Sequence, residues 1–393
     1  MSNLLSITSV FTYIGYIVLA IIVLLFMVLI HELGHYTAGK ILKFKINEFS
    51  VGFGPKLIQK TKKNGEKITL RALPLGGYCA FEGEGEDGQT NPQAFNNQKP
   101  WKRLIVLFFG AFFNFLSGII FSFILLISSG YDLVEIKNLN ENSINYNNNT
   151  FQTGDVIYGI DGTDIDFVHD EYFNNLLTAS VTEYYSKYAG SIEDLQNEYS
   201  FSDDGKTYYL DTQSMIFNVR RQGEDIEITG NINVIYNDKG EYAGWSLYST
   251  EQADLNEFAI GNYKYSFLES LIEAVPFTCK WAWKIIVIFG QLITGQLSLT
   301  SLGGPVTTIN TIASYTQTGG WAYLAVLLPL IAINLAVFNL LPIPALDGFQ
   351  MIFVLIEWIR KKPLKQTVIN TINNVGLIVL LCFVILVDIL QFV

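Results

Sequence analysis

The sequence has 393 residues, of which 50% are hydrophobic and 16% charged, and its formal net charge is −11. This is the composition of a membrane protein, and no basic stripe outside the predicted membrane segments and their flanks indicates nucleic-acid binding. The three cysteines lie in different segments without ligand-like spacing, so the sequence predicts neither a disulfide framework nor a thiolate metal site.

Residues 8–30 form the first predicted membrane span, because about 20 consecutive apolar residues cross a bilayer. The run is too long for a cleavable signal peptide and has no basic start. The following loop, 36–103, carries nearly half of the chain's 25 basic residues. The positive-inside rule therefore places this loop in the cytosol and the N-terminus outside.

Within the loop, residues 45–58 and 66–84 have the pattern of short strands, and Asn64-Gly65 between them is a hairpin turn signal. We expect a membrane-associated β-hairpin on the cytosolic side. Glycines in strands leave backbone groups open to pair with another strand, although an ordinary surface hairpin fits the same pattern. The glycines concerned are Gly52, Gly54, Gly76 and Gly77.

The uncharged stretch from Leu104 to Tyr131 predicts a second span. Inside it, Gly110 and Asn114 recur at helical spacing, which fits close helix packing as easily as a catalytic role. Residues 132–255 are rich in acids and strand-like segments, and they lie outside by the count of crossings. Part of this region, 166–214, has little periodicity and could be an inserted lid or a disordered excursion.

No charged residue occurs from Ile285 to Leu346, and hydropathy alone suggests two crossings there, near 283–300 and 321–341. One crossing is the better interpretation, because it returns Asp347 to the cytosolic side, where the first span ends. The stretch 283–319 is then expected to lie on the membrane or dip into it. Residues 366–387 form the last predicted span, which brings the total to about four.

The first span ends in His31, Glu32 and His35, an H-E-x-x-H pattern that contains two of the chain's three histidines. On a helix, residues four apart lie on one face, so both imidazoles can reach one metal ion. Neutral imidazole suits Zn²⁺, and a neighbouring carboxylate that is not a ligand can accept a proton from water. Ionisable groups at this depth are costly and usually functional. The pattern predicts a zinc hydrolase site.

A catalytic zinc site needs a third protein ligand, and Asp347 is the favoured candidate. It follows two prolines that break a membrane helix, and a carboxylate there is expensive without a counter-charge. Glu48, Glu357 and Asp388 are the alternatives. Glu48 reads as a solvated strand residue, Glu357 as part of a surface helix, and Asp388 lies near the opposite face.

Four features together resemble the site-2 protease family: HELGH (31–35), PLGGY (74–78), Gly110 with Asn114, and NLLPIPALDG (339–348). More narrowly, they resemble the bacterial membrane-embedded zinc metalloproteases of regulated intramembrane proteolysis, which carry a PDZ domain between spans two and three. The resemblance covers nearly the whole chain.

The resemblance implies a Zn²⁺ ion held by His31, His35 and Asp347, with Glu32 as general base. It also implies that Asn339 and the hairpin 46–78 handle the substrate. A substrate helix must unwind before its peptide bond can react, and pairing with the hairpin by β-augmentation would hold it extended.

The implied fold is a polytopic α-helical membrane protein of about four spans, with a cytosolic-side hairpin and an extracytoplasmic PDZ-like α/β domain. The expected domains are an N-terminal protease half (1–131), the PDZ-like domain with its insertion (132–255), and a C-terminal protease half (256–393). The family's usual helix start before the GD turn is absent from 142–155, where the sequence is NSINYNNNTFQTGD. The expected location is the bacterial cell membrane, with the active site toward the cytosol.

The implied activity is zinc-dependent cleavage of single-span membrane proteins, such as anti-sigma factors, other regulators or signal-peptide remnants. An upstream site-1-type protease is the expected partner. Two other classes of function are alternatives. A catalytically inactive membrane scaffold could bind peptides through the PDZ-like domain and would lack stoichiometric zinc. A transporter could use a broken helix, but no inverted repeat is visible and transport does not need H-E-x-x-H.

Overall fold

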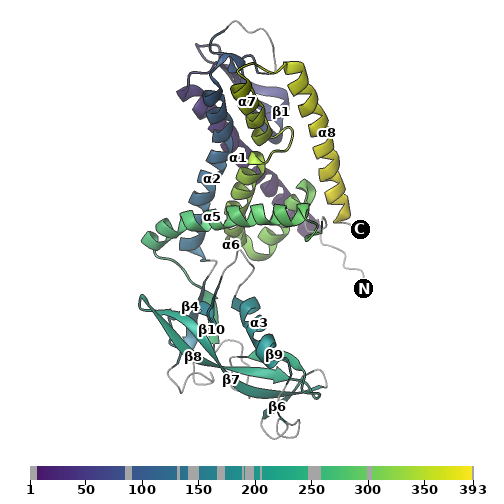
Figure 1. The fold of residues 1–393 in the computed structure, drawn as a ribbon. Helices are drawn as coiled ribbons and strands as arrows, with labels where there is room; N and C mark the ends of the chain where they lie inside the picture. The colour runs from purple at the N-terminus through teal and green to yellow at the C-terminus, as the bar shows by residue number, and fades with distance from the viewer. Residues whose placement is uncertain are drawn as a thin grey trace. The chain divides into compact units, whose positions relative to one another are not determined.

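The chain folds into two compact units in the computed structural model (Figure 1). The first unit is Met1–Leu125 together with Leu271–Val393, and the second is Leu126–Ser270. The two ends of the chain therefore build one unit. The residues that the structure describes are 7–84, 91–130, 133–139, 150–165, 173–187, 190, 199–203, 206–246, 258–298 and 303–391.

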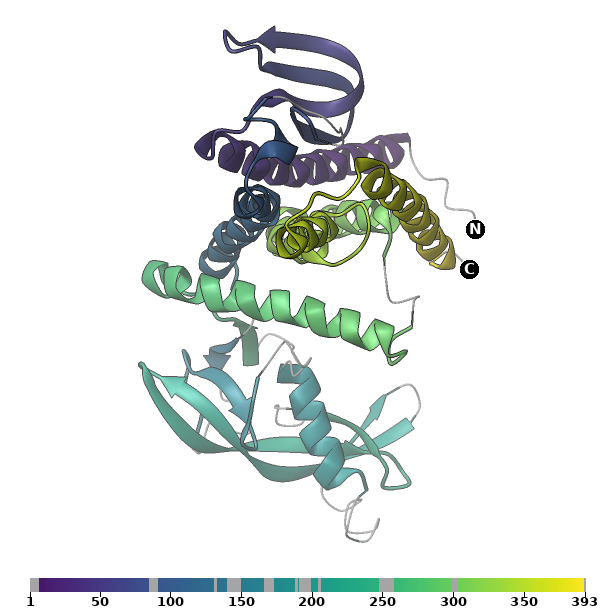
Figure 2. The ribbon, with the colours of Figure 1, turned by 45° about the horizontal axis from the view of Figure 1, so that its top comes forward.

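Long helices form most of the first unit (Figure 2). They are α1 (Ile7–Ile41), α2 (Pro100–Ser128), α5 (Phe267–Ile293), α6 (Pro305–Leu340), α7 (Asp347–Arg360) and α8 (Gln366–Leu390), with a short 3₁₀ helix η1 (Phe95–Asn97).

Within the described residues, three helices are long and apolar enough to cross a membrane: Phe11–Ile41, Pro100–Ser128 and Gln366–Leu390. They coincide with three of the predicted spans, as expected of a multi-pass membrane protein. The fourth predicted crossing falls in α6, whose apolar part, Leu324–Leu340, is shorter. The total of four spans remains a prediction.

The ends of α6 are set by proline and glycine. Pro305 occupies its first turn, where the missing N–H costs nothing. Gly320, with φ 63° and ψ −148°, kinks the helix in its middle. The helix ends at Leu340, just before Pro342. The stretch 283–319, expected to lie on the membrane or dip into it, is divided between α5 and the first part of α6, and its depth in the bilayer remains a prediction.

The expected hairpin is formed by β1 (Ile46–Thr61) and β2 (Lys67–Phe81), which pair antiparallel. The two long strands bend back, so the first part of β1 pairs on both sides: Phe49 opposes Cys79 and also Ile68. The bend uses Gly52 and Gly54, with φ of 82° and 80°. A Cβ on Gly52 would lie 2.7 Å from the Leu73 carbonyl oxygen, so only glycine fits there.

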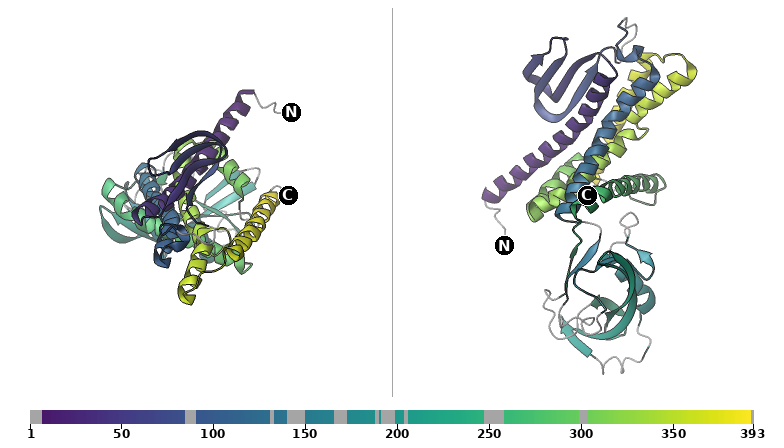
Figure 3. Two further views of the ribbon diagram at one scale, coloured as in Figure 1. Left: turned by 90° about the horizontal axis from the view of Figure 1, so that it is seen from above. Right: turned by 90° about the vertical axis from the view of Figure 1, so that its left-hand side faces the viewer.

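The hairpin packs against the end of α1 (Figure 3). Aromatic side chains at this contact include Phe44, Phe81 and Phe95, which form one buried cluster with residues of α2 and α7. A second cluster joins the middle of α1 to α6 through Met27, Ile312 and Ala332. Apolar packing thus fixes both α2 and α6 relative to the helix that carries the histidines.

Among its described residues, the second unit contains an antiparallel sheet and the helix α3. Its strands follow the order β10-β3-β4-β7-β8-β9, with β5 paired to β4 and β6 to β7. The elements are β3 (Val134–Leu139), β4 (Val156–Ile160), β5 (Thr163–Asp164), α3 (Phe173–Tyr185), β6 (Tyr199–Asp203), β7 (Lys206–Arg221), β8 (Glu224–Tyr236), β9 (Tyr242–Ser246) and β10 (Phe258–Asn262).

The region 166–214, expected to be an inserted lid or a disordered excursion, is ordered where the structure describes it. It contributes α3, β6 and the first part of β7. Phe173, Leu177 and Val181 of α3 are buried in the core of this unit. Residues 142–149, part of the stretch that lacks the family's usual helix start, lie outside the described residues. The assignment of this unit as a PDZ-like domain remains a prediction.

Candidate active site

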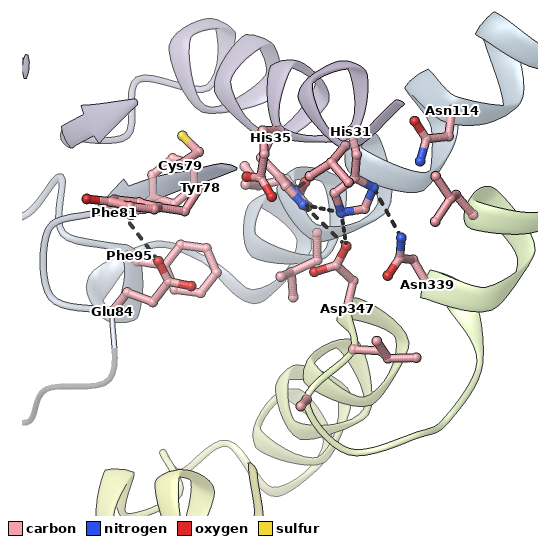
Figure 4. A pocket seen from close by; sticks show the side chains of 18 residues that line it. His31, His35, Tyr78, Cys79, Phe81, Glu84, Phe95, Asn114, Asn339 and Asp347 are labelled. Carbon is pink, nitrogen blue, oxygen red and sulfur yellow. Dashed lines mark hydrogen bonds and ion pairs between the residues drawn. The ribbon is translucent and has the colours of Figure 1, made fainter. Parts of the chain in front are cut away.

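The two histidines of α1 lie on successive turns and point to one place. Their Nε2 atoms are 3.1 Å apart, and both side chains are buried. The ring planes are nearly perpendicular, at 88°. In Figure 4 both rings face the start of α7. Helical spacing alone brings the pair together, as the sequence predicts.

Asp347 completes a three-residue cluster with these histidines. Its Oδ2 lies 3.0 Å from His31 Nε2 and 3.2 Å from His35 Nε2. The carboxylate reaches this point because the chain breaks after α6 at Pro342 and Pro344 and restarts as α7 at Asp347.

The break itself is tightly packed. Ala345 adopts a positive φ of 75°, which costs energy for a residue with a side chain. A Cβ on Gly348 would lie 2.3 Å from the Leu340 carbonyl oxygen, so the chain can fold back on the end of α6 only with glycine there. The LDG sequence therefore serves geometry as well as chemistry.

The alternative carboxylates are all engaged elsewhere. Glu48 accepts a hydrogen bond from Arg71 at 2.9 Å. Glu357 was expected on a surface helix, and this was wrong: it is buried and forms an ion pair with Arg103. Asp388 caps α6 by accepting hydrogen bonds from the backbone N–H groups of residues 306 and 307. Of the four carboxylates considered, only Asp347 lies with the histidines.

The three side chains fit a zinc ion. Bonds of about 2.0 Å in tetrahedral geometry place ligand atoms about 3.3 Å apart, close to the spacing of the two Nε2 atoms and Oδ2. All three candidate ligand atoms lie within 4.8 Å of one another. Asp347 Oδ2 is buried without a hydrogen-bond partner, as a ligand atom reserved for a cation would be. Three protein ligands leave one position for water or substrate.

Each imidazole has a second contact through Nδ1. His35 Nδ1 lies 2.8 Å from the Val106 carbonyl oxygen, so Nδ1 donates and Nε2 keeps its lone pair for a metal. His31 Nδ1 lies 3.5 Å from the Asn339 side-chain amide. When His31 also carries its proton on Nδ1, that nitrogen requires a hydrogen-bond acceptor. Asn339 supplies the acceptor when its side-chain amide is oriented with Oδ1 toward the ring.

Glu32 lies beside the cluster without joining it. It faces β2, because a Cβ built on Gly77 would be 3.7 Å from Glu32 Cγ. Glu32 and Cys79 of β2 also line the same pocket. Glu32 is therefore placed between the candidate ligands and the hairpin.

A pocket of about 570 Å³ opens beside these residues (Figure 4). Residues 78–81 of β2 form one wall, and Asn114, Asn339 and Asp347 lie along others. The close approach of α2 requires Gly110, where a Cβ would meet His35 Nε2 at 2.5 Å.

Only some of the residues predicted to handle substrate lie at the pocket. Asn339 lines the pocket and contacts His31. Gly76 and Gly77 lie where β2 enters the pocket wall. Gly52 and Gly54 lie at the bend of β1 and do not line the pocket.

Two lining residues that the sequence pattern does not single out contribute polar atoms to the pocket or its histidines. Glu84, just beyond β2, lines the pocket and accepts a hydrogen bond from the Phe81 N–H at 3.4 Å. Val106 contributes only its backbone carbonyl, which no side-chain pattern reveals. Glu84 could have been suspected, since it closely follows the glycine-rich strand.

Comparison with known proteins agrees with this site. The model of peptidase family M50 matches residues 19–383. A relative from Fusobacterium nucleatum is 29% identical over 379 residues, covering 94% of this chain and 96% of its own. One from Clostridium perfringens is 28% identical, covering 95% and 97%, and one from Campylobacter jejuni is 28% identical, covering 92% and 89%. All three carry the name "Putative zinc metalloprotease". These matches do not favour the scaffold interpretation.

Proposed function

The chain belongs to peptidase family M50, the site-2 protease family, and we propose that this zinc metalloprotease cleaves single-span membrane proteins within or near the bilayer. The observation that carries the proposal is the meeting of His31, His35 and Asp347 at the end of an apolar helix. A protease that acts only on soluble proteins gains nothing from ligands on a membrane-spanning helix.

A site with these ligands is expected to bind a zinc ion and a water molecule. When bound, zinc supplies a Lewis acid that polarises the scissile carbonyl and makes water more acidic. His31, His35 and Asp347 would hold the ion, and the Nδ1 contacts of the histidines fix their orientation. Glu32 accepts a proton from the attacking water and delivers it to the leaving amine.

The substrate is held extended along β2. Residues 77–81 pair with β1 on one side, and residues 78–81 line the pocket. No other strand among the described residues pairs with β2. A substrate strand added at this edge by β-augmentation would present its carbonyl to the ligand cluster and Glu32.

The membrane arrangement follows from charge and exposure. The basic residues of loop 36–103 support a cytosolic location for the hairpin and the site. Leu57, Ile58 and Leu73 of the hairpin are exposed apolar side chains, which supports contact with lipid. We place the protein in a bacterial cell membrane, with four spans.

The second unit is proposed to be the extracytoplasmic PDZ-like domain between spans two and three. Within that scheme the substrates are anti-sigma factors, other regulators or signal-peptide remnants, and a site-1-type protease trims them first. Asn339, Gly76 and Gly77 belong to the substrate path in this proposal, and Gly52 and Gly54 support it by shaping the bend.

The test is Glu32→Gln, which removes the general base and leaves the candidate ligands unchanged. Loss of general-base catalysis is expected to slow cleavage by about 100- to 10,000-fold. Membrane proteomics of cells with wild type or Glu32→Gln should show single-span proteins that accumulate in the variant. Glu224→Gln, at an exposed position of β8, is the matched control and should accumulate nothing. Cleavage at the wild-type rate by zinc-loaded Glu32→Gln would overturn the assignment.

A further inference from the structure

Asn114 is a buried amide without a partner. It lies in the middle of α2, and its exposed fraction is 0%. Neither Oδ1 nor Nδ2 makes a hydrogen bond. Burying an unpaired amide costs free energy, and such groups in native proteins call for an explanation. An apolar residue of similar size would pack here at lower cost if packing were its only role.

This side chain belongs to the catalytic pocket. Asn114 lines it together with His31, Asn339 and Asp347. One helical turn earlier, Gly110 lets α2 touch both imidazoles, so Asn114 follows on the face of α2 turned toward the site. In Figure 4, Asn114 and residues Tyr78 and Cys79 of β2 flank the ligand cluster on opposite sides.

The two asparagines of the pocket differ in what they contact. The Asn339 amide lies 3.5 Å from His31 Nδ1 and is used to orient that ring. The Asn114 amide has no such partner. Of the two pocket asparagines, Asn114 is therefore the one whose side-chain donor and acceptor are both without a partner.

We propose that Asn114 binds the backbone of the extended substrate. An amide side chain offers one donor group and one acceptor, the complement of a peptide unit. A substrate strand that pairs with β2 has its backbone hydrogen-bonded along one edge only. Little water is present at membrane depth to hydrogen-bond the other edge. Asn114 Nδ2 donates to a substrate carbonyl and Oδ1 accepts from a substrate N–H on that second edge. The inference rests on the proposed function, because it needs a peptide in the pocket.

The test compares two zinc-chelating probes on the purified full chain. Acetohydroxamate reaches the metal but has no peptide backbone, whereas a leucyl-alanyl peptide hydroxamate adds one. Asn114→Leu should weaken the peptide hydroxamate at least tenfold and leave acetohydroxamate unchanged. Zinc content should equal that of wild type. Ser122→Ala is the control, since Ser122 is also fully buried in α2 but is hydrogen-bonded to Thr278.

Equal binding of the peptide hydroxamate by wild type and Asn114→Leu would overturn the inference while leaving the proposed function intact. If Asn114→Leu loses zinc or fails to fold, Asn114→Ala takes its place, and the same selective loss is expected. Parallel weakening of both probes by zinc-loaded Asn114→Ala would mean a structural role and overturn the inference. A wild-type protein that binds neither zinc nor either probe would overturn the proposed function itself.

Discussion

At the scale of single residues, Gly110 controls how closely α2 approaches the two histidines. A Cβ there would lie 2.5 Å from His35 Nε2 and 2.7 Å from His31 Cε1, and neither ring can retreat without leaving the cluster. Gly110→Ala should therefore reduce zinc binding by at least tenfold, measured by metal analysis after dialysis against a weak chelator. Gly15→Ala on α1 is the control, because nothing lies within 4 Å of that Cβ. Full zinc retention in Gly110→Ala would contradict the close packing described.

Glu66 is the second residue with a clear consequence. It is fully buried and accepts hydrogen bonds from Tyr36, Lys40 and Lys62, which fasten the hairpin turn to the end of α1. Burial opposes its ionisation, but the hydrogen bonds from Lys40 and Lys62 outweigh burial and lower the pKa of Glu66 from 4.5 to about 2.

Because the pKa is lowered by folding, the stabilisation from Glu66 is complete above pH 4.5 and is lost as the pH falls toward 2. Glu66→Gln should lower the stability of the hairpin by about 2 kcal/mol at pH 7, and the difference from wild type should shrink below pH 4.5. Hydrogen exchange of residues 46–81 at several pH values measures this. A difference that grows with acidity would reverse the sign and refute the assignment.

The sequence is most informative about residues whose charge is costly to bury without a counter-charge. Asp347 was favoured because a carboxylate after a broken membrane helix needs a cation, and it lies 3.0 Å from His31. Asn114 remained ambiguous between packing and catalysis, because an amide is cheaper to bury than a charge. Only its lack of partners separates the two interpretations.

At the scale of secondary-structure elements, one buried ion pair holds α7 against α2. Arg103 Nη1 and Glu357 Oε2 are 2.5 Å apart, with side-chain exposures of 8% and 7%. Glu357 also accepts a hydrogen bond from Leu364 N–H, which fixes the turn after α7. Since α7 begins at Asp347, the ion pair positions one end of the helix whose other end supplies a candidate ligand.

Arg103→Met should destabilise the protein by about 3–5 kcal/mol, because it leaves Glu357 buried without a counter-charge. The double variant Arg103→Met, Glu357→Leu should recover most of that loss, since two packed apolar residues replace a desolvated pair. Thermal unfolding in detergent measures both. A double variant less stable than Arg103→Met would contradict the argument.

The hairpin shows what patterns of strands and turns can predict. The two strands and the Asn64-Gly65 turn were expected, and β1 and β2 are joined there. The double pairing of Phe49 with Cys79 and Ile68 was not expected. It depends on positive φ at Gly52 and Gly54, and a glycine in a strand pattern does not reveal its φ.

At the scale of the whole molecule, the sequence predicts which segments are membrane helices better than how they connect. Three predicted spans match apolar helices among the described residues. Hydropathy could not resolve 283–341, because α6 begins with a polar, threonine-rich stretch and continues through the kink at Gly320. Composition measures the cost of burial in lipid but not the helix-to-helix contacts that decide where a long helix runs.

A zinc ion held by His31, His35 and Asp347 would join the two ends of the chain in the first unit, and this makes zinc removal a test of the whole arrangement. His31 and His35 come from α1 and Asp347 from α7, so binding favours the folded state by RT ln(1 + [L]/Kd), about 2.7 kcal/mol at a hundredfold excess over Kd. A strong chelator should lower the unfolding temperature by several degrees, and added zinc should restore it. Asp347→Asn should already be destabilised and respond little to chelator. An equal response in wild type and Asp347→Asn would mean that the ion which stabilises the fold is bound elsewhere.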